Sequence, residues 1–91
     1  MRLFKTIDDK FEDIGFKKIE ENKYGAVYER YDEKYKYNQR LDIMHKASGH
    51  HLIHSYDETN TTSEFSPSVG LTGYEMKLAL KKMKKLKLYS K

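Results

Sequence analysis

The chain contains no cysteine at all. This absence excludes disulfides, thiolate zinc sites, iron–sulfur clusters and cysteine nucleophiles. Long apolar runs are missing as well, because the longest aliphatic stretch is Leu78-Ala79-Leu80. We therefore expect neither a transmembrane helix nor a signal-peptide core, and we expect a cytoplasmic protein that makes no use of the membrane.

The length and the composition predict one small folded domain that covers residues 1–91. Charged residues make up 35% of the chain and apolar residues 37%, which is polar for a globular protein. Eight tyrosines and four phenylalanines nevertheless argue against disorder, since disordered chains are poor in aromatic residues. A domain of this size has room for one modest core.

The net charge of +4 is unevenly distributed along the chain. Residues 1–75 carry eleven basic and fourteen acidic side chains, a net charge of −3, whereas residues 76–91 carry seven lysines and no acid. A basic segment of this kind is typical of a surface that attracts phosphates or acidic partners, or of the solvated side of a terminal helix.

Two segments have the periodicity of amphipathic helices, and we predict helices over residues 2–14 and 72–88. Apolar residues recur at three- and four-residue spacing in both segments. Gly15 follows the first segment as a C-terminal cap, and Thr72 and Glu75 have the spacing of a capping box.

Four strands are predicted between the helices, over residues 16–21, 24–31, 37–46 and 50–56. The third is the clearest, because Leu41 and Ile43 alternate with Arg40 and Asp42. The connections between the strands are short, which favours an antiparallel meander. A Ser/Thr/Asn-rich loop over residues 57–70 follows, and we expect fast hydrogen exchange there.

The predicted fold is therefore α+β, in the order α-β-β-β-β-α, with a four-stranded antiparallel sheet and both helices packed on one of its faces. The residues expected to be mostly buried are Leu3, Ile7, Phe11, Ile14, Leu41, Ile43, Met76, Leu80 and Met83.

A cluster of histidines is the first candidate for chemistry, and its members are His45, His50, His51 and His54. If Ser48-Gly49 forms a two-residue turn, His45 lies diagonal to His54. The two would then share a metal only with a third ligand such as Asp57 or Glu58. A three-residue turn would destroy the pair. We expect no metal ion here, and the hairpin register stays open at this point.

Sequence patterns of known catalytic or cofactor sites are missing. The chain has no phosphate-binding GxxxxGK[ST] loop, no GxGxxG and no G-x-S-x-G elbow. Neighbouring acids such as Asp8-Asp9 do not converge on one helix face. We therefore expect a protein that is not an enzyme and that has no cofactor.

The strongest functional signal lies in the C-terminal lysines together with the tyrosines of the meander. The candidate partner-binding residues are Lys77, Lys81, Lys84, Lys85, Tyr28 and Tyr35. Tyrosine is favoured at interfaces because it offers apolar area and a hydroxyl group. The same lysines suit nucleic-acid phosphates, although the helix has no arginine to read base edges.

Three segments carry a resemblance to known proteins: Tyr28-Glu-Arg-Tyr-Asp32, Leu41-Asp-Ile-Met-His-Lys-Ala-Ser-Gly49 and Gly70-Leu-Thr-Gly-Tyr-Glu-Met-Lys-Leu-Ala-Leu80. They are similar to segments of small uncharacterised proteins encoded by phages and prophages of Gram-positive bacteria. The resemblance implies an accessory protein in the host cytoplasm, and proteins of that kind often bind a host or defence factor. It implies no catalytic residue.

The expected function is thus binding of another protein, or self-association in which the lysine helix of one copy meets the acidic body of another. The alternative is nucleic-acid binding through the C-terminal lysines. The acidic body would repel phosphates unless it faces away, so we rank this alternative second.

Overall fold

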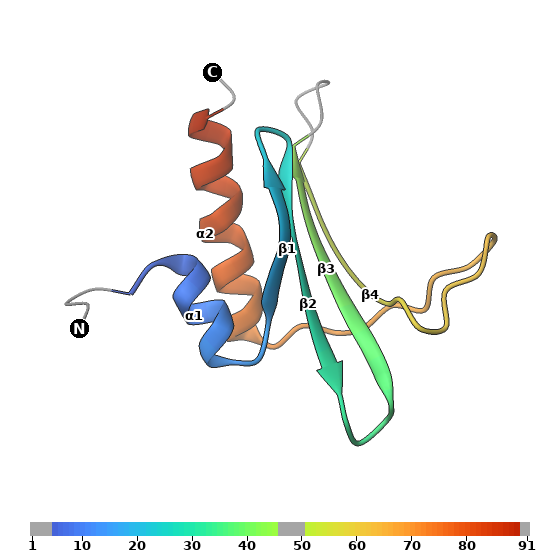
Figure 1. Ribbon diagram of the computed structural model, residues 1–91. Coiled ribbons are helices and arrows are strands. Elements are labelled where there is room, and N and C mark those ends of the chain that lie inside the picture. The colour runs from blue at the N-terminus through green and yellow to red at the C-terminus, as the bar shows by residue number, and fades with distance from the viewer. Residues whose placement is uncertain (1–4, 46–50, 90–91) are drawn as a thin grey trace.

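The structure is a computed structural model that describes residues 5–45 and 51–89, with side chains for all of these except residues 45 and 87–89. Its elements are α1 (Ile7–Asp13), β1 (Lys17–Asn22), β2 (Gly25–Asp32), β3 (Tyr37–His45), β4 (His51–Asp57) and α2 (Gly73–Tyr89). The strands form one antiparallel sheet in the order β1-β2-β3-β4, and both helices lie on the same side of it (Figure 1). The predicted α+β fold is confirmed. The predictions for Leu3, the Ser48-Gly49 turn and His50 lie outside the described residues.

Helix α1 is shorter than the sequence predicted. It begins at Ile7 because Thr6 caps it: the Thr6 side chain accepts a hydrogen bond from the Asp9 backbone, and the Asp9 side chain accepts one from the Thr6 backbone. The predicted start at residue 2 was therefore wrong, since Lys5 and Thr6 are not helical. Gly15 ends the helix with φ of 95°, as predicted for a C-terminal glycine.

The strand register determines which residues share a face of the sheet. Tyr28 pairs with Leu41, and Ile43 pairs with Ile53, so these residues lie on the face that the helices cover. The register of β1 against β2 shifts between Lys18 and Glu20, which leaves Ile19 exposed.

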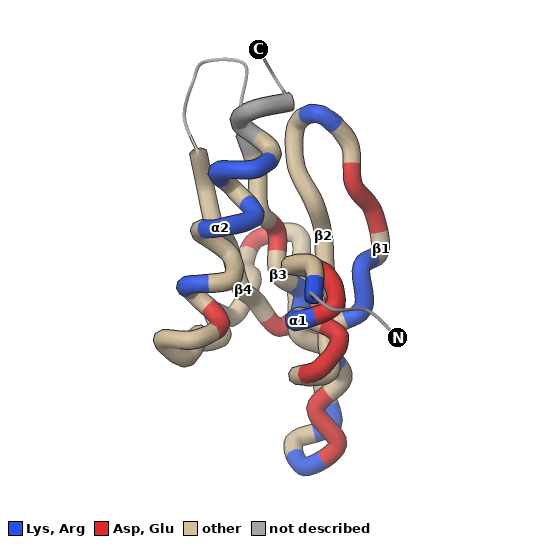
Figure 2. The backbone as a smooth tube through the Cα atoms, turned by 90° about the vertical axis from the view of Figure 1, so that its left-hand side faces the viewer, with Lys and Arg blue, Asp and Glu red and all other residues tan. Residues whose placement is uncertain are grey.

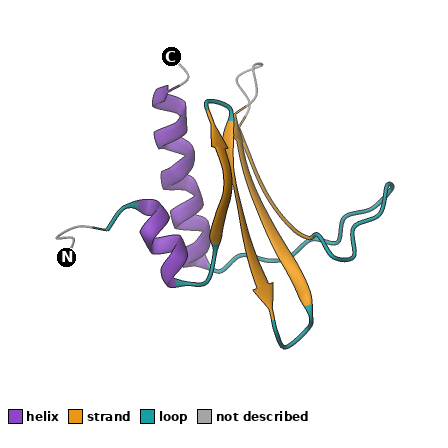
Figure 3. Cartoon of the chain, viewed as in Figure 1, coloured by secondary structure: helices purple, strands orange, loops and turns teal. Residues whose placement is uncertain are grey.

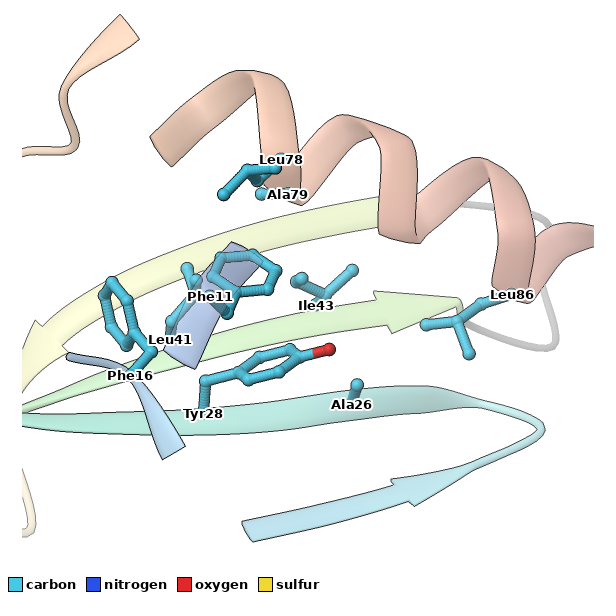
Figure 4. Packing of buried hydrophobic residues seen from close by; sticks show 9 residues of the cluster. All are labelled: Phe11, Phe16, Ala26, Tyr28, Leu41, Ile43, Leu78, Ala79 and Leu86. Carbon is cyan, nitrogen blue, oxygen red and sulfur yellow. The ribbon is translucent and has the colours of Figure 1, made fainter. Parts of the chain in front are cut away.

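The core lies between the helices and the sheet (Figure 4). The ring of Phe11 of α1 packs against the Tyr28 ring in a tilted arrangement at a centroid distance of 4.3 Å and meets Phe16 edge-on at 5.7 Å. The buried apolar residues are Phe11, Phe16, Ala26, Tyr28, Leu41, Ile43, Leu78, Ala79 and Leu86. Ile7, Ile14, Ile53, Leu71 and Met83 pack against this cluster and are partly buried.

Helix α2 is rotated about its axis relative to the orientation that its apolar stripe predicted: Met83 packs against the core as expected, but two other members of the stripe do not. Met76 is 39% exposed and Leu80 is 46% exposed, so the prediction that both are buried was wrong. Leu78, Ala79 and Leu86 face the core instead. Helix α2 still begins within one residue of the predicted start, because Thr72 and Glu75 form the capping box.

Two charged residues are also buried on the side of α2 that faces the core. Glu75 is 6% exposed and forms an ion pair with Arg30 of β2 at 2.8 Å. Lys82 is 3% exposed and contacts Asp8 at 3.2 Å and Glu21 at 2.5 Å. These contacts favour the orientation in which positions 75, 78, 79, 82 and 86 point inward, because a buried charge needs a partner.

Asp8 is the centre of the network around Lys82. Its carboxylate accepts hydrogen bonds from the Tyr28 hydroxyl at 2.5 Å, from Lys18 at 2.9 Å and from Lys82 at 3.2 Å. Partial burial by itself raises the pKa of Asp8, but the three donors outweigh it and lower that pKa to about 2. The network therefore ties α1, β1, β2 and α2 together.

The depressed pKa of Asp8 predicts a pH-dependent stability. Asp8 stabilises the fold fully above its ordinary pKa of 3.8, and this stabilisation is lost as the pH falls toward about 2. Urea unfolding gives the free energy of unfolding of the wild type and of Asp8→Asn. The difference between the two proteins should be larger at pH 5 than at pH 2 by about 1–2 kcal/mol, after allowance for solvent screening. A difference that does not change with pH would contradict this role of Asp8.

The loop between β4 and α2 is attached to the sheet at its two ends (Figure 3). Tyr56 and Ser68 form an antiparallel bridge, and the Val69 backbone donates to the Ser55 carbonyl at 3.0 Å. Phe65, between these attachments, is 65% exposed and does not anchor the loop. Fast hydrogen exchange in the middle of the loop stays a prediction.

Candidate protein-binding surface

The sheet has one face that no helix covers among the described residues. We call it the open face. Because side chains alternate along a strand, the neighbours of the buried Ala26, Tyr28, Leu41 and Ile43 point to this side. Its residues are Lys17, Glu20, Val27, Glu29, Tyr31, Asn38, Arg40, Asp42, Met44, Leu52, His54 and Tyr56. Figure 1 shows the helices on the other side of the sheet.

Apolar side chains gather at one end of the open face. Met44 pairs with Leu52 across β3 and β4, and these side chains are 41% and 43% exposed. Val27 lies beside them on β2 and is half-buried. Tyr24, just before β2, is exposed at the same end, whereas the exposed Tyr31 lies at the opposite end of β2. Paired apolar side chains that stay in water on a sheet are typical of a surface that meets a partner.

A shallow hollow of about 190 Å³ lies on this face between β1 and β3. Gly25 lines it, and glycine is required there because a Cβ would collide with the Ile43 carbonyl oxygen of the neighbouring strand. Tyr24, Val27 and Met44 give the hollow apolar walls, and Asp42 adds a carboxylate. The volume corresponds to about six water molecules, which suits one side chain of a partner.

Charged residues of the open face are arranged around Arg40. Its guanidinium lies 3.1 Å from Glu58, 3.5 Å from Asp42 and 3.8 Å from Glu29. Burial would lower the pKa of Arg40, but the surrounding Tyr56 and acidic groups raise it above its usual value. Burial also raises the pKa of Asp42, against the opposing effect of Arg40. Three carboxylates thus stand against two cations, Arg40 and the Lys17 that pairs with Glu29, so this part of the surface keeps a net negative charge.

The register of β3 and β4 separates the two histidines that the sequence suggested as a metal pair. His45 opposes His51, whereas His54 opposes Asp42, so positions 45 and 54 alternate to opposite faces of the sheet. The pairing that a two-residue turn would produce is therefore wrong. The His54 ring stacks on Tyr56 at 4.6 Å on the open face. Within the described residues, no group of three metal-ligating side chains comes together.

We predict that zinc does not stabilise the protein. Titration with zinc should leave the melting temperature unchanged, because positions 45 and 54 lie on opposite faces of the sheet. A saturable stabilisation at one equivalent that disappears in His54→Ala would overturn this prediction, since a site filled at a hundred times its Kd adds about 2.7 kcal/mol.

The four lysines predicted to bind a partner lie together on the outer side of α2. Lys77, Lys81, Lys84 and Lys85 are all exposed. Figure 2 shows basic residues along α2 and acidic residues along α1 beside it. Lys82, in contrast, is buried and already paired with Asp8 and Glu21.

The two tyrosines predicted to bind a partner differ in their surroundings. Tyr28 is completely buried and donates its hydroxyl to Asp8, so its prediction as a surface contact is wrong. Burial and the neighbouring Asp8 raise the pKa of Tyr28. Tyr35 is 68% exposed in the turn between β2 and β3. The structure does not bring it together with the lysines of α2.

Comparisons with known proteins add no relative, because no family model, curated protein or solved structure matches the chain. Across residues 5–45 and 51–89, neither helix has the length and apolar content needed to cross a membrane.

Sequence reasoning missed the open face as a candidate site. The alternation of Arg40, Asp42 and Met44 along β3 was visible, and Met44 is the apolar member of that polar series. An apolar residue on the polar side of an alternating strand was the sequence feature that could have indicated this surface.

Proposed function

We propose that the protein is a non-enzymatic binding protein that recognises another protein through its open face. The observation that carries the proposal is the exposed pair Met44 and Leu52, next to Val27 and a hollow that suits one side chain. Water contact with this apolar area is unfavourable, and a partner that covers it gains the corresponding free energy.

The chemistry of the surface indicates what kind of segment binds. An apolar anchor of the partner would enter the hollow, and basic side chains next to it would meet Glu20, Glu29, Asp42 and Glu58. Apolar centres with a charged rim are the usual anatomy of protein interfaces. Acidic surroundings also disfavour nucleic acid at this face, because phosphates are repelled.

The resemblance noted in the sequence suggests the setting. We place the protein, as part of the proposal, among phage or prophage accessory proteins that act in the cytoplasm of a bacterial host. Its partner would then be a host or defence protein with an apolar and basic segment.

Capture from a lysate of a Gram-positive bacterium tests the proposal. Wild type should retain a stoichiometric partner protein after nuclease treatment, and Met44→Glu/Leu52→Glu should lose it. Both side chains are more than 40% exposed, so the variant should fold. Lys81→Glu/Lys85→Glu is the matched control and should keep the partner. A partner that is lost with the lysine variant and kept by the open-face variant would overturn the proposal.

The second candidate function is nucleic-acid binding, and the exposed lysines of α2 favour it. Binding to a labelled single strand and a labelled duplex, at low and physiological salt, separates the two functions. We expect binding that disappears at physiological salt, because a few lysine–phosphate contacts are strongly screened. Sub-micromolar binding that survives this salt and is lost in Lys81→Glu/Lys85→Glu would establish the second function instead.

A further inference from the structure

Helix α2 carries a second exposed apolar surface, on the side of the molecule away from the open face. Leu80 is 46% exposed and Met76 is 39% exposed. They are one turn apart, and the neighbours of Leu80 at helical spacing include Lys77 and Lys84. We call Met76, Lys77, Leu80, Lys81 and Lys84 the outer stripe of α2.

The outer stripe and the open face complement each other in composition and in charge. Each has two large apolar side chains that are about 40–50% exposed: Met76 and Leu80 on the helix, Met44 and Leu52 on the sheet. The lysines of the stripe face solvent, and no acid occurs after Glu75 in the sequence. The open face, in contrast, holds three carboxylates around Arg40.

The two elements that carry these surfaces, α2 and β3, are also similar in length. Helix α2 has seventeen residues and is about 25 Å long at 1.5 Å per residue. Strand β3 has nine residues and is about 30 Å long at 3.3 Å per residue. A helix lying on a sheet is the same kind of packing that the chain already uses on the other face of its sheet (Figure 1).

We infer that the open face of one copy binds the outer stripe of α2 of a second copy. This inference rests on the proposed function, because it names one occupant of the open face. Leu80 and Met76 would cover Met44 and Leu52, while the lysines would meet the carboxylates around Arg40. The two surfaces lie on opposite sides of the molecule, so the contact is head-to-tail and can repeat from copy to copy.

The contact predicts a specific pattern in sedimentation velocity. Wild type should form larger species as its concentration rises from micromolar to millimolar, and physiological salt should weaken this association. Met44→Glu and Leu80→Glu should each stay monomeric, with association at least about tenfold weaker. Both positions are exposed, so both variants should fold, and Tyr35→Glu, which changes an exposed residue outside both surfaces, should associate like wild type.

Mixing the two monomeric variants is the decisive step. Met44→Glu keeps an intact outer stripe and Leu80→Glu keeps an intact open face, so the mixture should form a dimer and nothing larger. A mixture that stays monomeric, or a wild type that stays monomeric at all concentrations, would overturn the inference. In another outcome, the wild type is monomeric in sedimentation while Met44→Glu/Leu52→Glu loses a partner protein in the capture experiment. That pair of results would overturn self-association alone and would support the proposed function. Association of the wild type that survives Met44→Glu would also overturn the inference.

Discussion

Replacing Leu78 with alanine should lower the free energy of unfolding by about 2–5 kcal/mol. Leu78 is 1% exposed and lies in the main apolar cluster, so its removal leaves a cavity between α2 and the sheet. A chain of this length has a total stability of about 5–14 kcal/mol, so the loss is a large fraction of it. Urea unfolding monitored by circular dichroism measures the change.

Leu80→Ala is the matched control for this prediction. It makes the same chemical change two residues away, but at a position that is 46% exposed. We expect a loss below about 1 kcal/mol at protein concentrations low enough to prevent self-association. A larger loss for Leu80→Ala than for Leu78→Ala would mean that α2 presents the other side to the sheet, which is the arrangement its apolar periodicity suggested.

Replacing Lys82 with methionine should cost about 2–4 kcal/mol. The change removes a buried cation and leaves Asp8 and Glu21 without it, although Lys18 still contacts both. Removal of one partner from a fully buried ion pair costs about 3–5 kcal/mol, and the value here is smaller because both carboxylates are about 30% exposed. Urea unfolding at neutral pH gives the measurement.

Lys84→Met controls for the change in charge and in helix propensity. Lys84 is exposed on the same helix, and we expect its replacement to change stability by less than about 0.5 kcal/mol. Equal effects of the two substitutions would contradict the network. The double variant Asp8→Asn/Lys82→Met should lose less free energy of unfolding than the sum of the losses in the two single variants. The reason is that the second substitution removes a charge that the first has already left unpaired.

The fold class was predictable from the sequence, whereas the orientation of α2 was not. The alternation in β3 and the short connections were sufficient for the meander, and the capping box located the start of α2 within one residue. The apolar stripe of α2 was misleading because Glu75 and Lys82 point inward. Their partners Arg30, Asp8 and Glu21 come from β2, α1 and β1, and such distant pairings leave no local signal.

The candidate surface was less predictable than the fold. Sequence shows which residues share a face of a strand, but both faces of a sheet are possible positions for the helices. Tyr28 illustrates this, because a tyrosine suits an interface and a core equally well, and only the contact of its hydroxyl with Asp8 decides between them. Lysine is rarely buried, and Lys77, Lys81, Lys84 and Lys85 are exposed on α2, but Lys82 is buried, so residue type alone does not decide the position of a lysine. That the four exposed lysines bind a partner stays a prediction.

Photo-cross-linking in bacterial cells tests most directly whether the open face is the surface that binds a protein. A photoreactive residue would replace Met44 on the open face, Lys81 on the outer side of α2 or Tyr35 in the β2–β3 turn, three exposed positions. We predict covalent adducts to another protein chain from position 44 and none from position 35. Adducts from position 81 to nucleic acid, with none to protein from position 44, would contradict the proposed function.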